Sequence, residues 1–205
     1  MTPVYWKQAN HELAACDKVM HHLIQHFEGA SLTSRGCAFT TLARSIVGQQ
    51  ISVKAAESVW QKMIRTIPDM TPHTIASAEQ GLLRACGLSL RKISYLQDLS
   101  QHFMRRTLNE TTWAEMDDEA IIVQLTKVKG IGRWTAEMFL IFHMQRPDVL
   151  PLDDIGLQRA ISQHYNDHQP VNKKMMLEFA KPWQPWRSVA TWYLWRSLDP
   201  LPVEY

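Results

Sequence analysis

The feature that most limits how this chain can fold is a Gly-Ile-Gly sequence, Gly130 to Gly132, between two segments of helical character. Glycine accepts the positive φ values that other residues avoid, and it lets another molecule approach the backbone closely. The first turn of the following helix leaves N–H groups without helical partners, so such a turn can bind an anion. On its own, the pattern favours an ordinary helix–helix turn closed by glycine.

Basic residues surround this turn, and an acidic pair follows it. Lys127, Lys129 and Arg133 flank the glycines, and no Lys-Ser/Thr pair of a nucleotide-binding loop comes after them. We therefore expect the anion to be a phosphate of a nucleic-acid backbone. Further along, a proline-containing loop leads to Asp153 and Asp154 at the start of another helical segment.

Apolar residues recur at helical spacing along most of the chain, and no segment reads as a strand. We expect one packing helix within residues 4–27, and a pair of helices within residues 39–63 separated by Gly48, Gln49 and Gln50. Tryptophans gather near the C-terminus, in an aromatic-rich segment within residues 172–195. The remaining helices are expected within residues 68–83, 87–103, 117–125 and 155–165. The prediction is an all-α fold, with about ten helices in two lobes.

Composition adds mainly exclusions. A formal net charge of +2 argues neither for nor against binding to nucleic acid, because such binding depends on where the charges lie. Cys16, Cys37 and Cys86 form no CxxC pair, which argues against a zinc site and a disulfide framework. No stretch approaches the roughly 20 apolar residues that cross a bilayer, and the first residues lack the apolar core of a signal peptide. We expect a cytoplasmic protein, nucleoid-associated if bacterial, with reduced thiols.

The central pattern reads Val-x-Gly-Ile-Gly-Arg-Trp-Thr-Ala-x-x-Phe over residues 128–139, followed by the proline-bounded loop and Asp154. It resembles the helix-hairpin-helix, Gly/Pro-Asp superfamily of base-excision DNA glycosylases, and within it the 3-methyladenine DNA glycosylase II branch. The likeness runs from Phe39 to Leu198. It implies one domain over residues 1–205, with an N-terminal helix, helical lobes at about 36–125 and 126–198, and the active-site cleft between the lobes.

The resemblance also assigns the catalytic group. Cleavage of the bond between base and deoxyribose passes through an oxocarbenium-like sugar, which a carboxylate beside the anomeric carbon stabilises. The residues alone leave open which of Asp153 and Asp154 does this, and either also suits a helix N-cap. The resemblance implies that Asp154 is catalytic and that Asp153 is a cap or a supporting group.

Further roles follow from the resemblance, because such an enzyme must flip its target nucleotide out of the duplex. Gln50 is expected to wedge into the duplex. Other family members carry an aromatic residue where this chain has Met138, which bears on the shape of the base pocket. The implied pocket residues are Trp134, Met138 and Trp195, and the implied DNA-binding residues are Gln50, Gly130, Gly132, Arg133 and Thr135. The implied ligands of a structural monovalent cation are the main-chain carbonyls of Thr126, Val128 and Ile131.

The expected activity is hydrolysis without strand cleavage. Bifunctional relatives carry a lysine where this chain has Trp134, and without that amine no Schiff base can form. No cysteine follows Cys86, so the four-cysteine iron–sulfur loop of one sub-branch cannot be present. We predict a monomeric, monofunctional glycosylase that excises 3-methyladenine and 7-methylguanine from double-stranded DNA, with no cofactor needed for catalysis.

Two other functions fit part of the pattern. A non-catalytic helix-hairpin-helix module that binds duplex DNA would explain the Gly-Ile-Gly turn. It would leave Asp154, the Gln50 loop and the tryptophans unexplained. A glycosylase-lyase for oxidised bases is disfavoured by Trp134 and by the missing cysteines.

Overall fold

The computed structural model describes residues 2–34 and 36–198, which form two compact units. The first unit combines residues 2–34 with residues 140–198, and the second contains residues 36–139. All regular secondary structure in these residues is helical, which confirms the all-α prediction. None of the described helices is both long and apolar enough to cross a membrane.

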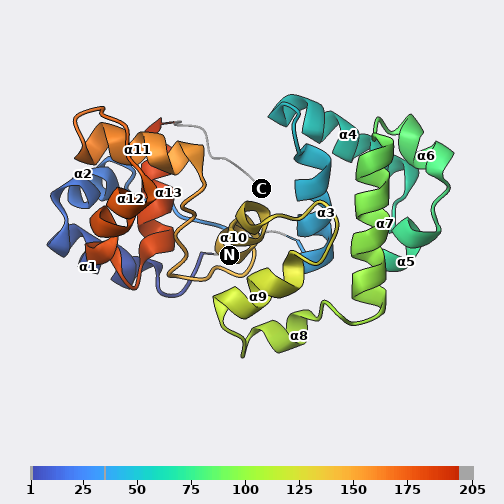
Figure 1. Cartoon of the computed structure of the whole chain (residues 1–205), viewed down its shortest axis with the longest axis horizontal. Helices are drawn as coiled ribbons and strands as arrows, with labels where there is room; N and C mark the ends of the chain where they lie inside the picture. The colour runs from blue at the N-terminus through green and yellow to red at the C-terminus, as the bar shows by residue number, and fades with distance from the viewer. Residues whose placement is uncertain (1, 35, 199–205) are drawn as a thin grey trace. The chain divides into compact units, whose positions relative to one another are not determined.

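The helices are short (Figure 1). Most begin after a residue whose side chain accepts a hydrogen bond from a backbone N–H of the first turn. The first unit contains α1 (Trp6–Cys16), α2 (Lys18–His26), α11 (Ile155–Tyr165), α12 (Lys173–Phe179), the 3-10 helix η1 (Lys181–Trp183) and α13 (Arg187–Leu198). The second contains α3 (Ala38–Gly48), α4 (Val53–Thr66), α5 (Pro72–Ser77), α6 (Gln80–Ala85), α7 (Leu90–Met104), α8 (Glu110–Trp113) and α9 (Asp118–Leu125). One helix, α10 (Arg133–Phe142), begins in the second unit and ends in the first.

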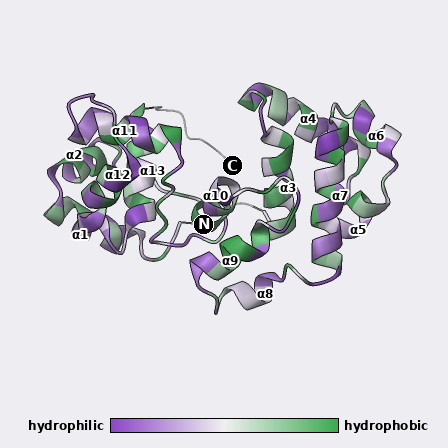
Figure 2. Cartoon of the chain, viewed as in Figure 1, coloured by the Kyte–Doolittle hydropathy of each residue, from purple (hydrophilic) through white to green (hydrophobic). Residues whose placement is uncertain are grey.

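The second unit is built around α7, against which α3, α5 and α6 pack. Ile93, Leu96 and Leu99 recur at spacings of three residues and are fully buried, so they form one apolar stripe on α7. Figure 2 shows strongly hydrophobic segments in α3 and α9. The predicted break between α3 and α4 lies where expected, and Ser52 caps α4 through a bond from Ala55 N to its Oγ of 3.2 Å.

The first unit is built around α13, which packs against α1, α2 and α11. Every residue from Ser188 to Leu194 is buried, so α13 is covered on all sides over nearly two turns. Trp6 of α1 meets Trp192 edge-on at 5.2 Å between ring centroids, and Tyr193 at 5.8 Å. The tryptophan cluster therefore supplies core packing in addition to any role in a pocket.

The single N-terminal helix that we predicted is wrong, because Asp17 divides residues 4–27 into α1 and α2. Asp17 has an extended backbone, and its Oδ1 accepts from Val19 N at 2.8 Å and from Met20 N at 3.0 Å. Its Oδ2 accepts from Tyr165 Oη and Trp183 Nε1, both at 2.9 Å. Apolar periodicity continues through the break, so it gave no sign of this cap.

The division into lobes also differs from the prediction. The boundary falls between residues 139 and 140, within α10, rather than near residue 125, and residues 2–34 join the C-terminal part. The start of α10 belongs to the second unit because Phe139 packs edge-on against Trp113, with 5.4 Å between ring centroids. The cleft expected between the lobes stays a prediction, since the structure defines each unit by itself.

Candidate active site and nucleic-acid interface

The Gly-Ile-Gly turn joins α9 to α10, and these three parts form what we call the hairpin. Gly130 has a φ of +83°, and a Cβ at this position would lie 2.1 Å from the Tyr95 ring. The fold itself therefore requires glycine at 130. A Cβ at Gly132 would meet no atom within 4 Å, so the backbone there is open to an approaching group such as a phosphate.

Arg133 connects the two helices of the hairpin. Its Nη1 and Nη2 donate to Glu119 Oε1 and Oε2 at 2.9 and 2.7 Å, and its Nε donates to Glu137 Oε1 at 3.0 Å. These hydrogen bonds and charges raise the pKa of the Arg133 guanidinium. This geometry differs from the phosphate contact that we predicted, because two carboxylates already neutralise the side chain.

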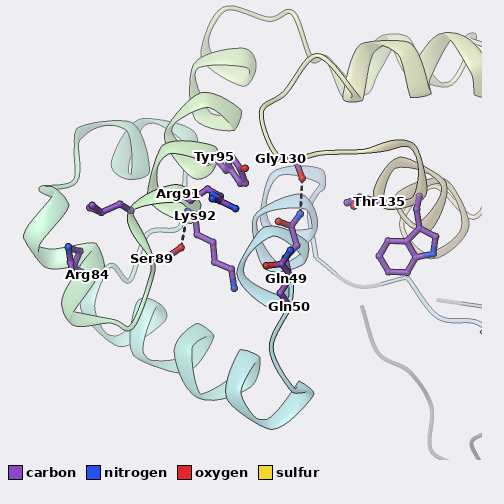
Figure 3. A pocket seen from close by; sticks show the side chains of 11 residues that line it. Gln49, Gln50, Arg84, Ser89, Arg91, Lys92, Tyr95, Gly130 and Thr135 are labelled. Carbon is purple, nitrogen blue, oxygen red and sulfur yellow. Dashed lines mark hydrogen bonds between the residues drawn. The ribbon is translucent and has the colours of Figure 1, made fainter. Parts of the chain in front are cut away.

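The loop that presents Gln50 is held by two hydrogen bonds, of which Figure 3 draws the one between Gln49 and Gly130. Gln49 Nε2 donates to Gly130 O in the hairpin at 2.7 Å. Lys92 Nζ donates to Val47 O in the last turn of α3 at 2.7 Å, and burial lowers the pKa of this ammonium group. Gln50 itself is exposed and has a φ of +60°, a left-handed conformation that costs energy for a residue with a side chain. The neighbouring bonds therefore hold the predicted wedge residue in place.

A groove of about 870 Å³ opens beside this loop in the second unit. It brings together four of the predicted residues, namely Gln50, Gly130, Trp134 and Thr135, and adds residues that sequence reasoning had not assigned to the site. Trp134 keeps 37% of its surface exposed. The full lining is Gln49, Gln50, Arg84, Ser89, Leu90, Arg91, Lys92, Tyr95, Gly130, Trp134 and Thr135.

In the first unit, Asp154 begins α11 and is 8% exposed. Its Oδ1 accepts from the backbone N of Leu157 at 2.6 Å and from Trp195 Nε1 at 2.8 Å. The two donors fix the orientation of the carboxylate before any substrate arrives. The structure therefore brings together Asp154 and Trp195, which the sequence separates by 41 positions.

Gly156 and Phe142 complete the surroundings of Trp195, and sequence reasoning missed both. A Cβ at Gly156 would lie 3.1 Å from Asp154 Oδ1 and 3.3 Å from Trp195 Cδ1, so any larger residue would crowd the contact between the indole and the carboxylate. Phe142 stacks on Trp195 with ring centroids 5.7 Å apart and planes 11° from parallel. In the sequence, the only sign of this close contact was a glycine, Gly156, two residues after Asp154.

Two predicted roles need correction or narrowing. Asp153 is not a cap: it is exposed and forms an ion pair with Lys173, while Asp154 caps α11. Met138 is only 2% exposed and does not line the groove, so the structure describes it as a core residue of α10. Met138 shares a helix face with Trp134, one turn earlier, but the second turn of α10 is covered by the core where Trp134 is partly exposed.

Among the described residues, no group of three or more His, Cys, Asp or Glu could hold a metal ion. The predicted cation site is of another kind, because it uses the main-chain carbonyls of Thr126, Val128 and Ile131. Val128 O accepts from Ile131 N at 3.1 Å, and a carbonyl oxygen has a second lone pair for a cation. The site therefore stays a prediction.

Comparison with known proteins decides the family. Residues 43–185 match the HhH-GPD superfamily of base excision DNA repair proteins, a span that includes the Gln50 loop, the hairpin and Asp154. The chain belongs to this superfamily. DNA-3-methyladenine glycosylase 1 of Schizosaccharomyces pombe is 32% identical over 164 residues, covering 78% of this chain and 72% of the relative.

Solved structures within the superfamily agree. A DNA-3-methyladenine glycosidase from Bacillus halodurans superposes with a TM-score of 0.85 at 32% identity, covering 93% of this chain and 89% of the other. The S. pombe 3-methyladenine DNA glycosylase, determined in complex with abasic DNA, gives a TM-score of 0.81 at 28% identity. That match covers 97% of this chain and 99% of the other. The glycosylase fold is thus shared over nearly the whole chain.

Proposed function

We propose that this chain is a monofunctional DNA glycosylase that flips alkylated bases out of duplex DNA and hydrolyses the N-glycosidic bond. The observation that carries the proposal is the buried Asp154 carboxylate, oriented through Oδ1 by Leu157 N and Trp195 Nε1. A relative of similar fold has been determined with abasic DNA, the product of base removal. Two relatives that are 32% identical to this chain are named as 3-methyladenine glycosylases, which supports the same reaction.

The chemistry follows from a fixed negative charge. As the base leaves, positive charge develops on the deoxyribose, and a preoriented carboxylate stabilises that charge without needing to reorganise. Asp154 can also orient the water that attacks the sugar. Trp134 stands where a lyase would need its lysine, so this chain lacks the amine for a Schiff base, and the product is an intact abasic strand.

DNA binding is assigned to the second unit. The open backbone at Gly132, in the turn before α10, offers N–H groups to a phosphate. Gln50, exposed beside the groove, fills the space that the flipped nucleotide leaves in the stack. The partner is therefore double-stranded DNA rather than a free nucleoside.

The preferred bases are those that are already good leaving groups. With a carboxylate and no evident general acid, the enzyme gains most from a base that carries positive charge, such as 3-methyladenine or 7-methylguanine. Trp134 and Trp195 are the aromatic residues proposed to attract such a base. A cation–π contact contributes about 0.5 to 2 kcal/mol, enough for a preference but not for absolute selectivity.

Three finer assignments complete the proposal. The protein acts as a monomer in the cytoplasm. Catalysis needs no cofactor. A monovalent cation held by the carbonyls of Thr126, Val128 and Ile131 would stiffen the hairpin turn, since carbonyl oxygens suit such ions.

The deciding experiment is release of free base from methylated duplex DNA by the purified protein. We expect 3-methyladenine and 7-methylguanine to appear in solution, while the strand stays uncut until alkali is added. DNA binding with no base release would instead identify a non-catalytic module. Ready release of 8-oxoguanine or uracil, with 3-methyladenine left in place, would contradict the leaving-group argument.

A further inference from the structure

The hairpin turn is tied to α7 by a carboxylate that the proposed function does not use. At the end of α9, the N–H groups of Thr126, Lys127 and Val128 donate to main-chain carbonyls three or four residues earlier. The N–H of Lys129 donates to a side chain instead, with 2.9 Å between Lys129 N and Asp98 Oδ2. The run of main-chain hydrogen bonds that leaves α9 therefore ends on a residue of α7.

Two residues of α7 contact neighbouring residues of this turn. Tyr95 and Asp98 are three positions apart, so they lie on the same face of the helix. The Tyr95 ring occupies the space that a Cβ at Gly130 would need, and the Asp98 carboxylate accepts from Lys129 N. The ring limits the path of the backbone, and the hydrogen bond fixes the orientation of the peptide before Lys129.

The Asp98 carboxylate is itself held in place. Its side chain is 21% exposed, and His102 Nε2, one turn further along α7, lies 3.7 Å from Oδ2. The other ring nitrogen, His102 Nδ1, lies 2.8 Å from Thr107 Oγ1, which also donates to His102 O at 3.0 Å. The acceptor for Lys129 N thus stands on a rigid helix, which orients a group more accurately than a loop does.

Electrostatics alone does not explain an aspartate at this position. A carboxylate beside a turn that binds phosphate repels DNA, and the ion pair from Oδ1 to Lys129 Nζ, at 3.4 Å, is exposed and contributes little. Arg133, on the other side of the glycines, is also bound to carboxylates, those of Glu119 and Glu137. The turn therefore offers a phosphate mainly its main-chain N–H groups, whose directions depend on how the backbone is held.

We propose that Asp98 is a positioning residue for DNA binding, which holds the turn through Lys129 N so that the open backbone at Gly132 faces a phosphate. The inference rests on the proposed function, because it takes the hairpin as the element that binds phosphate. Asp98 contacts neither the base nor the sugar in this arrangement. It acts on the affinity for DNA, whereas Asp154 acts on the rate of base release from bound DNA.

The direction of the change when Asp98 is removed separates positioning from charge. The measurement is binding to a duplex that carries a tetrahydrofuran abasic analogue. Loss of a negative charge near DNA tightens binding, but Asp98→Ala should weaken it by roughly three- to tenfold, because a hydrogen bond that holds the turn is lost. Glu115→Ala is the matched control: Glu115 is an exposed carboxylate of the same unit, so its loss should leave binding unchanged or slightly tighter. Binding by Asp98→Ala as tight as that of Glu115→Ala would overturn the proposal.

Two conservative variants separate the hydrogen bond from the charge. Asp98→Asn keeps an oxygen that can accept from Lys129 N but has no charge, so it should bind DNA at least as tightly as wild type. Asp98→Glu keeps the charge but displaces the carboxylate by one methylene group, so it should bind as weakly as Asp98→Ala. The reverse order, with Asp98→Glu tight and Asp98→Asn weak, would contradict a positioning role. This pair remains decisive if Asp98→Ala does not fold.

Two further measurements place the effect in the turn. The Lys129 amide proton, observed by NMR, should exchange with solvent at least about tenfold faster in Asp98→Ala than in wild type or Asp98→Asn. Combining Asp98→Ala with Gly132→Ala should weaken DNA binding no further than Gly132→Ala alone, since both substitutions affect one phosphate contact. Additive losses would show that Asp98 acts elsewhere.

The outcome is separate from that of the proposed function. With DNA fully bound, the single-turnover rate of Asp98→Ala should stay within about twofold of wild type, because Asp154 is untouched. A large fall in that rate would refute an effect on binding alone. Absence of base release by wild type, with the predicted order of affinities among the Asp98 variants, would overturn only the glycosylase assignment. Normal base release with equal affinities in all variants would overturn only the role of Asp98.

Discussion

At the scale of single residues, Asp154 has two roles that share one oxygen. Oδ1 accepts from Leu157 N as the cap of α11 and from Nε1 of Trp195, a predicted pocket residue. The same contacts that stabilise the helix therefore orient the group proposed to act on the sugar. A residue that keeps the cap but loses the charge can separate these roles, and asparagine does so, because it caps helices about as well as aspartate.

We expect Asp154→Asn to slow base release by on the order of 10²- to 10³-fold, because it removes the negative charge that stabilises the sugar cation. Its free energy of unfolding should change by less than about 1 kcal/mol, since the cap remains. Single-turnover assays and urea unfolding measure the two effects. Asp153→Asn is the control: its ion pair with Lys173 is exposed, so activity and stability should both stay near wild type. Equal activity in wild type and Asp154→Asn would refute the catalytic assignment.

The two glycines of the hairpin turn should respond differently to alanine. Gly130→Ala must strain a φ of +83° and displace the Tyr95 ring, so it should destabilise the protein by about 2 kcal/mol or more. Gly132→Ala meets open space and should fold normally, yet weaken binding to duplex DNA because a methyl group stands where a phosphate would approach. Thermal unfolding and DNA titration of both variants test this contrast. If a folded Gly132→Ala variant bound DNA normally, the proposal that a phosphate binds at this turn would be refuted.

At the scale of elements, the loop after α3 and the hairpin act as one support. Gln49 reaches across 81 positions of the sequence to Gly130 O, and the loop leaves Gln50 exposed in a left-handed conformation. A wedge works only from a fixed position. The hydrogen bond from Gln49 should therefore affect excision of a paired base by holding Gln50 in place, and not through a contact of Gln49 with DNA.

This dependence can be measured with a pair of substitutions. Gln49→Met keeps the length of the side chain but removes the donor, and Gln50→Ala removes the wedge. Each should slow excision of a paired lesion by roughly ten- to hundredfold and spare a bulged lesion, because only the paired base needs the wedge. The double variant should be no slower than Gln50→Ala alone. Additive losses would show that Gln49 acts independently of the wedge.

Elements with local signals were predictable from the sequence. The break before α4 and the starts of α5, α7 and α9 follow Ser, Thr or Asp caps that act within three residues. The contacts that the sequence did not reveal join distant segments, such as Lys92 to Val47 and Tyr95 to Gly130. The break at Asp17 was missed although its cap to Val19 N and Met20 N is also local, because the apolar periodicity of residues 4–27 continues through it.

At the scale of the whole molecule, the first unit contains three tyrosines whose pKa values are raised by burial. Tyr5, whose hydroxyl donates to Gln145 O at 2.7 Å, has its pKa raised to about 12. Burial also raises the pKa of Tyr193, and burial together with the Asp17 charge raises that of Tyr165. The neutral form of each side chain is thus favoured in the folded state.

As the pH rises into the alkaline range, ionisation of these tyrosines should therefore lower the stability of the first unit before that of the second. The stability that the tyrosines contribute is fully present below the unfolded pKa of about 10, and it is lost as the pH rises through the higher folded values. Methyl NMR signals from each unit, followed from about pH 8 to 12, should show the first unit unfolding earlier. Tyr5→Phe should reduce the steepness of this loss. Simultaneous loss of both sets of signals, unchanged by Tyr5→Phe, would rule out the tyrosines as its cause.

The division of the chain was the least predictable property, because it depends on long-range packing. The hairpin pattern marked α9 and α10 but carried no sign that Phe139 would pack with Trp113 in the second unit. The contact of Trp6 with Trp192 likewise unites segments from opposite ends of the chain. Asp154 and Trp134 were found from the hairpin pattern, whereas Gly156 and the groove residues Arg84, Leu90 and Tyr95 required the fold.

The order in which the chain is synthesised gives this division a consequence in the cell. The second unit is a continuous segment, so it can fold as soon as residue 139 has left the ribosome. The first unit cannot, because Trp6 and Leu13 of α1 belong to a core centred on α13. At about 5 to 20 residues per second, α1 waits roughly 10 to 35 s for α13 to be made. During that interval its apolar face is uncovered, so nascent-chain chaperones should bind the N-terminal helices and leave the completed second unit alone.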